Sequence, residues 1–391
     1  MRLDRAAIAL VGATAMIVAG LVGFDEAVAA VDFRTIALLF GMMLVVGYLR
    51  LGGFFERLAA ALLARARSPL GVLGLVVVLS GVLSAFLVND VVCVALGPVV
   101  LTLARRLRRD PVPYLVALAT AANVGSTATI TGNPQNMIIG ALSGIPYATF
   151  AARLAPVSAI GLALNFVVVA LTFRARLSAE APAAPAPEAL ARPGEGGGDA
   201  DRRLLPRGIA VLAALVVLFF AGAPIAVASL GAGAVLLLGG VRPDRLYRQI
   251  DWSLLVMFAG LFVVVHGFER HVVSHWTLDR VAAGPRAPVA ALTAASAVLS
   301  NLVSNVPAVL LLKSVVTSLA HAARTQAWLT LAMASTLSGN LTPIASVANL
   351  IVVEAARREG VELGLLEYCR VGVPLTLATV AVGASWLVLV G

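Results

Sequence analysis

Charged residues are what this sequence has least of. Only 13% of its 391 residues are charged, whereas a typical soluble chain has about 25%. Hydrophobic residues make up 60%, and the mean hydropathy is +0.97. So few charges cannot cover the water-facing surface of a chain this long, which excludes a soluble multidomain protein. The composition and its long apolar runs predict an all-α polytopic membrane protein embedded in a lipid bilayer.

Cysteine and histidine are also scarce. Two cysteines, Cys93 and Cys369, exclude a disulfide framework, a cysteine-rich zinc site and a three-thiolate metalloid trap. Of four histidines only His271 and His275 are close in sequence, so neither a metal centre nor another cofactor is predicted. The chain lacks a GxxxxGK[ST] motif, and hence an ATPase site of its own, and it lacks a Gly-x-Ser-x-Gly nucleophile motif. We therefore expect a protein that is not an enzyme.

Lysine occurs once, as Lys313, among 29 basic residues, and the net charge is +9. The arginines do not indicate a nucleic-acid partner, because their placement follows membrane topology. With the N-terminus in the cytoplasm, 22 arginines fall on the cytoplasmic side and six on the other, as the positive-inside rule expects. This asymmetry predicts a multi-pass protein of the plasma (inner) membrane with an external C-terminus.

Nine apolar runs can cross the hydrocarbon, which needs about 20 residues. They are 7–23, 35–49, 112–143, 151–173, 208–222, 226–240, 252–268, 325–353 and 371–390. Two more apolar stretches, 70–104 and 288–320, are broken by a polar cluster, and each is predicted to be a helical hairpin. Residues 54–67 suit a helix lying in the interface. For residues 1–30, a signal peptide is the alternative to a retained helix.

The two halves of the chain resemble each other. VLSAFLVN (82–89) matches VLSNLVSN (298–305), and the polar pairs Thr129/Thr342 and Asn136/Asn349 also align. An odd number of crossings between the copies makes them inverted-topology repeats, as in many secondary transporters. The predicted domains are a first repeat at 1–176, a disordered cytoplasmic linker at 177–206, a connecting helix at 207–224 and a second repeat at 225–391.

Four polar clusters interrupt apolar sequence at membrane depth: 88–90, 125–136, 304–306 and 338–346. Non-helical backbone survives there only inside protein or beside a watery cavity, so we expect hairpin tips and broken helices at the midplane. Their half-helix N-termini suit an anion or a small polar oxide. The alternative is that these small polar residues only join helices. The candidate substrate and ion ligands are Asn89, Asp90, Asn123, Ser126, Thr127, Thr129, Asn133, Asn136, Ser304, Asn305, Asn340, Thr342, Ser346 and Asn349.

Two charged residues within predicted membrane segments are candidates for coupling. Asp90 is the only acidic residue deep in a predicted span, and a carboxylate there is costly and so a functional candidate. It can carry a proton or hold a cation, or be a structural partner of a nearby base. Lys313 can neutralise a substrate anion or pair with Asp90, or can reach toward the membrane edge.

The segments NDVVCVALGPVV, ANVGSTATITGNPQN, SNVPAVLLL and GNLTPIASVANLIV resemble the ion transporter superfamily. This superfamily includes divalent anion:sodium symporters, arsenite permeases, citrate–metal permeases and NhaD-type antiporters, and the arsenite-permease and NhaD branch is the most similar. The resemblance implies a homodimer of scaffold and transport domains that works as an elevator. It also implies a sodium site near Asn89 and Asn305 and a substrate-facing Asn136, although the residues flanking the two hairpin asparagines differ from the family's Ser-Asn-Thr.

We therefore expect a secondary transporter of a small anion or metalloid, coupled to protons or sodium as the coupling ion. One alternative is an arsenite or antimonite efflux permease that exchanges its substrate for protons, with a separate ATPase subunit as a partner if it is a pump. The other alternative is a sodium/proton antiporter in which Asp90 carries the cation.

Overall fold

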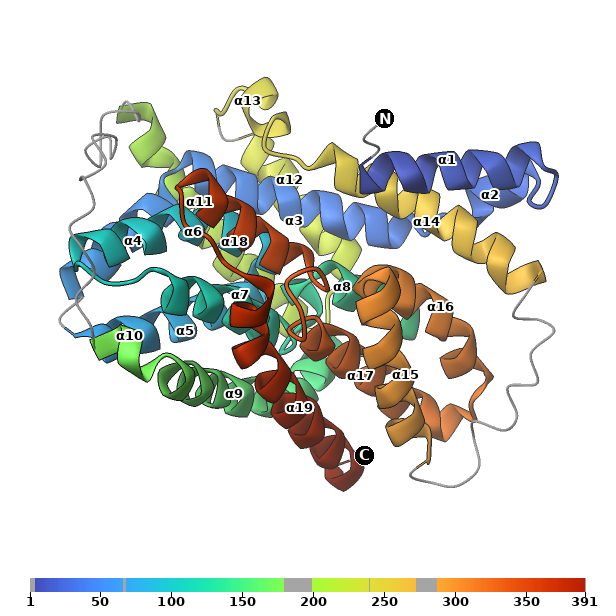
Figure 1. Ribbon diagram of the computed structural model, residues 1–391. Helices are drawn as coiled ribbons and strands as arrows, with labels where there is room; N and C mark the ends of the chain where they lie inside the picture. Colours follow the sequence, from blue (N-terminus) through green and yellow to red (C-terminus); the bar gives the residue numbers. More distant parts are fainter. Residues whose placement is uncertain (1–3, 66–67, 179–198, 239, 272–286, 391) are drawn as a thin grey trace.

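The computed structural model describes residues 4–65, 68–178, 199–238, 240–271 and 287–390. All regular secondary structure in these ranges is helical (Figure 1). The elements are α1 Arg5–Val18, α2 Phe24–Ala30, α3 Phe33–Leu51, α4 Phe54–Arg65, α5 Pro69–Phe86, α6 Asn89–Arg106, α7 Val112–Ser126, η1 Ile130–Gly132, α8 Pro134–Ser143, α9 Tyr147–Thr172, α10 Arg174–Ser178, α11 Asp199–Phe220, α12 Ile225–Leu237, α13 Pro243–Tyr247, α14 Trp252–His271, α15 Ala287–Val303, α16 Asn305–Ser318, α17 His321–Ser338, α18 Val347–Arg358 and α19 Leu365–Val390. The prediction of an all-α protein is confirmed.

Within the described ranges, five helices are long and apolar enough to cross a membrane: α3, α5, α9, α14 and α19. The polar interruptions have the predicted form, because α5–α6 and α15–α16 are hairpins, while α7–η1–α8 and α17–α18 are helices broken in the middle. Two boundaries differ from the expectation. The span predicted at 7–23 ends as α1 at Val18, and α11 already begins at Asp199, inside the predicted linker. The rest of that linker, 179–198, lies outside the described residues.

The first helix of each repeat packs against a helix of the other repeat. Helix α1 of the first repeat packs on α14 of the second, and α12 of the second packs on α3 of the first. Both crossings depend on a glycine, and the two glycines are aligned, because each follows an Asp-aromatic pair, Asp32-Phe33 or Asp251-Trp252, at the same spacing. A Cβ on Gly41 would lie 2.5 Å from the backbone of Ser229, and a Cβ on Gly260 would lie 2.8 Å from that of Ala9. This reciprocal packing fits two copies of one fold related by a two-fold axis.

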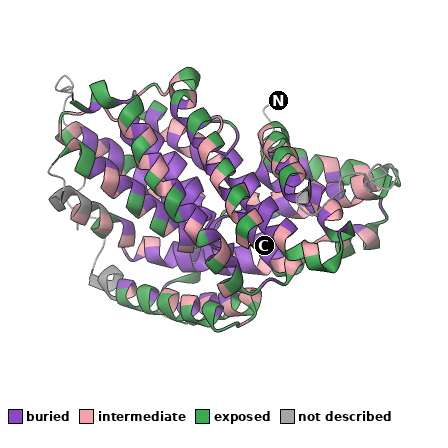
Figure 2. Cartoon of the chain, turned by 90° about the horizontal axis from the view of Figure 1, so that it is seen from below, coloured by how far each residue is buried: buried purple, intermediate pink, exposed green. Residues whose placement is uncertain are grey.

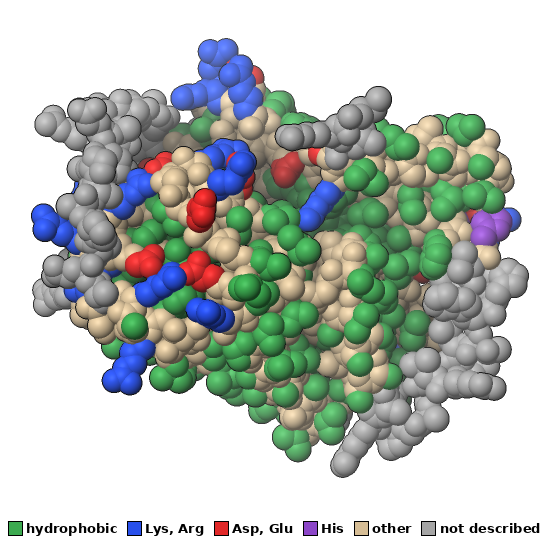
Figure 3. Space-filling model, viewed as in Figure 1, with side chains coloured by type: hydrophobic (Ala, Val, Ile, Leu, Met, Phe, Trp, Pro, Cys, Tyr) green, Lys and Arg blue, Asp and Glu red, His purple; other side chains and the backbone are tan. Residues whose placement is uncertain are grey.

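The core surrounds the broken helices. Every residue of α7 is buried, whereas the outer helices expose large apolar side chains such as Leu171, Leu238 and Leu389. Figure 2 shows buried residues in the middle of the molecule and exposed ones on the peripheral helices. In Figure 3 acidic and basic side chains gather on the side where α13 lies, and hydrophobic side chains cover much of the remaining visible surface. This distribution suits a lipid-embedded protein with its charged loops at the membrane surface.

Candidate functional site

The two breaks are held open by aligned asparagines. The Asn136 Nδ2 amide donates to the carbonyl oxygens of Ser126 and Thr129, at 3.1 and 3.0 Å. In the second repeat, Asn349 Nδ2 donates to the carbonyl oxygens of Gly339 and Thr342, at 2.7 and 3.2 Å. A broken helix leaves carbonyls without intrahelical partners, and one amide supplies two donors for them. Each asparagine therefore stabilises the break of its own repeat.

The same asparagines join the two repeats. Asn123 Nδ2 donates to Asn349 Oδ1 at 3.0 Å, and Thr336, which aligns with Asn123, donates to Asn136 Oδ1 at 3.4 Å. Ser346 Oγ donates to Asn123 Oδ1 at 3.1 Å, and the aligned Asn133 Nδ2 donates to Thr336 Oγ1 at 3.2 Å. These two symmetric pairs of hydrogen bonds form one buried polar network across the repeat interface.

A cavity of about 590 Å³ lies in front of this network. Four helices begin at its wall: α6 at Asn89, α8 at Pro134, α16 at Asn305 and α18 at Val347. Each helix N-terminus carries about half a positive charge and free N–H groups. The Oδ1 atoms of Asn89 and Asn305 are both buried and accept no hydrogen bond from the described residues. The cavity can therefore bind negative charge at the helix ends and, through the two amide oxygens, a small cation.

The structure divides the predicted ligands into two layers. Asn89, Asp90, Ser304, Asn305 and Ser346 line the cavity. The others do not line it and lie within the surrounding packing: Asn123, Ser126, Thr127, Thr129, Asn133, Asn136, Asn340, Thr342 and Asn349. The substrate-facing role that the resemblance implied for Asn136 differs from its place here, because its amide group is hydrogen-bonded to backbone carbonyls.

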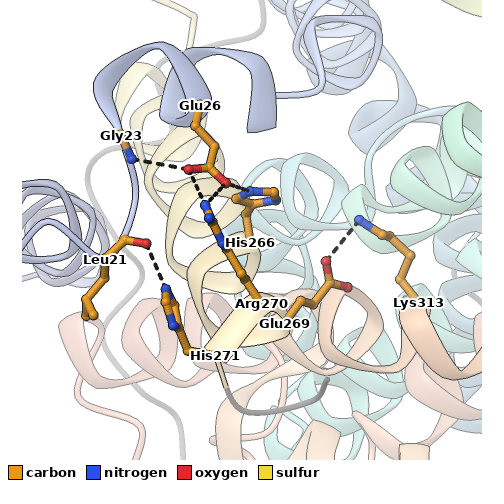
Figure 4. Close-up of polar contacts among 8 residues, drawn as sticks. All are labelled: Leu21, Gly23, Glu26, His266, Glu269, Arg270, His271 and Lys313. Atoms are coloured by element: carbon orange, nitrogen blue, oxygen red, sulfur yellow. Dashed lines mark hydrogen bonds and ion pairs between the residues drawn. The ribbon is translucent and has the colours of Figure 1, made fainter. Parts of the chain in front are cut away.

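The two candidate coupling residues lie apart. Asp90 lines the main cavity and also a smaller one of about 70 Å³, which Arg50 and Asp251 share. Lys313 pairs with Glu269 of α14 at 3.4 Å instead of with Asp90 (Figure 4). Of the alternatives for Lys313, the pair with Asp90 is therefore not present, since the lysine points from α16 toward the last turn of α14.

The end of α14 binds a second group of side chains. Glu26 of α2 accepts hydrogen bonds from Arg270 at 2.6 Å and contacts His266 Nε2 at 2.9 Å (Figure 4). The His266 hydrogen bond, the Gly23 backbone N–H and Arg270 together lower the pKa of Glu26 from 4.5 to about 2. His271 Nε2 lies 2.8 Å from the Leu21 carbonyl oxygen. These contacts attach the α1–α2 turn to α14.

Sequence reasoning missed four residues. Gln135, Asn301 and Arg5 line the cavity, and Thr336 joins the network behind it. Thr336 could have been found from its alignment with Asn123, and Gln135 from its position beside the predicted break. Arg5 is one of the arginines on the predicted cytoplasmic side, and no sequence signal distinguishes it from the others.

The model of the citrate transporter family CitMHS matches residues 1–338 and 271–390. An uncharacterised transporter of Mycobacterium tuberculosis is 31% identical over 406 residues, covering 99% of this chain and 94% of that protein. The silicon efflux transporter LSI3 of Oryza sativa subsp. japonica is 31% identical over 451 residues, covering 97% and 92%. The crystal structure of the YdaH transporter of Alcanivorax borkumensis has a similar fold, with a TM-score of 0.63 at 15% identity, covering 94% of this chain and 86% of that one.

Proposed function

The chain belongs to the citrate transporter family CitMHS and is a secondary transporter; from this premise we propose that it carries a small anion across the inner membrane, coupled to protons or sodium. The observation that carries the proposal is the convergence of four helix N-termini on one cavity. Their partial positive charges favour an anion without requiring many basic side chains. A substrate at this place lies between the two repeats, where secondary transporters bind their cargo.

Coupling is assigned to the first hairpin tip. Asp90 sits one residue after Asn89 and faces the cavity, so its protonation or its binding of a cation changes the charge that the substrate meets. The buried Oδ1 atoms of Asn89 and Asn305 supply neutral oxygen ligands for sodium. We propose that the hairpins and broken helices move as an elevator against α1 and α14, in a homodimer whose N-termini are cytoplasmic and whose C-termini are external.

The experiment is transport in proteoliposomes. Citrate and arsenite are offered under a pH gradient, a sodium gradient or neither, with Asp90→Asn compared with the wild-type protein. Asp244→Asn serves as the matched control, because Asp244 is exposed and is ion-paired with Arg242 on α13. Proton coupling predicts that uptake by the wild-type protein and the control follows the pH gradient, while uptake by Asp90→Asn does not. Gradient-dependent uptake by Asp90→Asn equal to that of the wild-type protein contradicts the assignment of Asp90.

A neutral hydroxide is a second candidate substrate. The amide and hydroxyl groups of Gln135, Asn301, Ser304 and Ser346 line the cavity, and such groups bind an uncharged hydroxide without a strong positive field. The name of the rice relative, a silicon efflux transporter, favours the same chemistry. Arsenite, which is mainly uncharged at neutral pH, is therefore the probe that separates this candidate from the carboxylates, and proton-coupled efflux of arsenite would establish it.

Sodium/proton antiport is a further candidate function. It requires acidic groups that exchange the two ions, and Asp90 shares the smaller cavity with a second carboxylate, Asp251. Sodium-driven proton movement in the proteoliposomes without any anion substrate would favour antiport over anion transport.

A further inference from the structure

The cavity has two unlike walls. The hairpin tips and broken helices form a polar wall, whereas the opposite wall consists of one face each of α1 and α14. These faces contribute Arg5, Ile8, Ala9 and Gly12 from α1, and Leu254, Met257, Leu261 and Val264 from α14. Both sets follow helical spacing, so each is a continuous stripe along its helix. Seven of these eight residues carry no polar side chain, and the eighth is Arg5.

The guanidinium of Arg5 has no ion-pair or hydrogen-bond partner in the described part of the chain. The neighbouring Asp4 caps α1, with Oδ1 accepting a hydrogen bond from the Ala7 N–H at 2.7 Å, and forms no ion pair with Arg5. Asp90 also lines the cavity and lies close enough to interact electrostatically with Arg5, but no salt bridge or hydrogen bond joins the two side chains. Arg5 therefore presents a fork of donors toward a space where a carboxylate or a similar oxyanion can accept them in bidentate fashion.

From this arrangement we infer that Arg5 binds the anionic substrate in the conformation described here and loses it in the opposite one. The inference rests on the proposed anion transport. Helices α1 and α14 are packed closely, because a Cβ on Gly260 would meet the Ala9 backbone at 2.8 Å and one on Gly12 would meet Val264 at 3.2 Å. Arg5 is thus fixed to this pair of helices, while the substrate sits against the hairpin tips.

A movement of the hairpins past α1 and α14 carries the substrate away from Arg5. A contact that exists in one state only gives that state a higher affinity, and the substrate then shifts the population toward it. With the N-terminus in the cytoplasm, the favoured state is the one that exchanges substrate with the cytoplasm. Arg5 is therefore a specificity-determining residue for one face of the membrane, and it selects charged over neutral substrates.

The test compares the two faces of the protein in proteoliposomes sorted by orientation, with citrate as the charged probe and arsenite as the neutral one. Arg5→Gln should raise the KM for citrate at the N-terminal face about tenfold and leave the KM at the opposite face unchanged. Arg5→Lys should restore part of the affinity, because it keeps the charge and loses the fork. The KM for arsenite should not change at either face.

The matched control is Arg242→Gln, because Arg242 is on the same predicted side, is exposed and does not line the cavity. The Arg5→Gln effect should persist in an Asp90→Asn background, since the contact is with the substrate and not with Asp90. An equal rise of KM at both faces, an equal effect on citrate and arsenite, or no effect overturns the inference and leaves the proposed function standing. If the wild-type protein moves neither probe, the proposed function fails and the inference fails with it.

Discussion

The two helical hairpins occupy equivalent positions in the two repeats, yet their tips differ in hydrogen bonding and in backbone conformation. At the first tip Asn89 Nδ2 donates to Asn123 Oδ1 at 2.9 Å, and the preceding Val88 has an ordinary backbone, with φ −57° and ψ 126°. At the second tip Ser304 has φ 77° and ψ 160°, a region that is occupied almost only by glycine. Aligned sequence positions thus have a relaxed backbone in one copy and a strained backbone in the other.

The contact between each hairpin and the broken helix behind it is also tighter in the first repeat than in the second. In the first repeat Gly125 of α7 lies against Gly81 of α5, so closely that a Cβ on Gly125 would be 2.1 Å from the Gly81 carbonyl oxygen. In the second repeat Ser338 takes the place of Gly125, and its hydroxyl is buried without a hydrogen-bond partner.

The hydroxyl of Ser296 in α15 is also buried without a partner, whereas the aligned Ser80 of α5 donates to the Val76 carbonyl oxygen at 2.6 Å. The next aligned pair, Ser84 and Ser300, does not differ, because both hydroxyls lack a partner. The comparison indicates that the first hairpin is held closely to its own broken helix, whereas the second is held less tightly to the equivalent helix.

The largest effect is expected at the glycine crossing of the first hairpin. Gly125→Ala places a Cβ against backbone that cannot rotate away, so it should lower the free energy of unfolding by about 3 kcal/mol or more. The aligned Ser338→Ala removes only an unpaired hydroxyl and should change it by less than about 0.5 kcal/mol. Thermal unfolding of the purified proteins in detergent measures both. Equal losses of stability would contradict the difference between the two crossings.

Replacement of the two tip asparagines by alanine should change the free energy of unfolding to different extents but impair transport in both cases. Asn89→Ala removes a buried hydrogen bond and should cost about 1–2 kcal/mol, whereas Asn305→Ala should be almost neutral for stability, because Asn305 Oδ1 has no partner. Both variants should lose sodium- or substrate-dependent transport, since both side chains line the cavity. Unfolding midpoints and proteoliposome uptake, measured on the same preparations, give the two readouts. Full transport by Asn305→Ala would remove the second tip from the site.

The hairpins and breaks themselves could be predicted from the sequence, because Asn, Gly and Pro at membrane depth are typical of interrupted helices, and because the clusters aligned in two copies. The roles of Asn136 and Asn349 could not. An asparagine in a break can face a ligand or satisfy freed carbonyls, and only the position of those carbonyls decides. The partner of Lys313 was missed because Glu269 lies just beyond the predicted span 252–268.

Glycine should act in opposite directions at the two tips. Ser304→Gly relieves a strained backbone and should stabilise the protein by about 1 kcal/mol. Val88→Gly frees the unfolded chain and also removes a buried side chain, so it should destabilise the protein by about 2 kcal/mol or more. If the strain at Ser304 also serves movement of the second hairpin, Ser304→Gly should in addition slow transport. Changes of the same sign in the two unfolding free energies would argue against strain at Ser304.

The smallest effect is expected at the ion pair of Glu26 and Arg270 between α2 and α14, because both side chains are partly exposed to solvent. The folded pKa of Glu26, about 2, is below the ordinary 4.5, so the ionised form favours the folded state. This contribution is fully present above pH 4.5 and is lost as the pH falls toward 2. The wild-type protein should therefore unfold at a higher temperature than Glu26→Gln at pH 6, and the difference should shrink as the pH falls to 3. A difference that is constant from pH 6 to pH 3 would exclude ionised Glu26 as its source.

The central claim is that the cavity between the hairpin tips is the transport site, and blocking it with a thiol reagent tests this most directly. Cys93 and Cys369 are first replaced by serine, and single cysteines are introduced as Ile344→Cys, which lines the cavity, or Tyr247→Cys on α13, which does not. Both positions are open, with 64% and 41% of the residue exposed, and neither lies on a helix long and apolar enough to cross the membrane. A charged methanethiosulfonate should abolish transport of the probe by the Ile344→Cys protein only, and excess probe should slow that labelling. Undiminished transport by fully labelled Ile344→Cys would contradict the account.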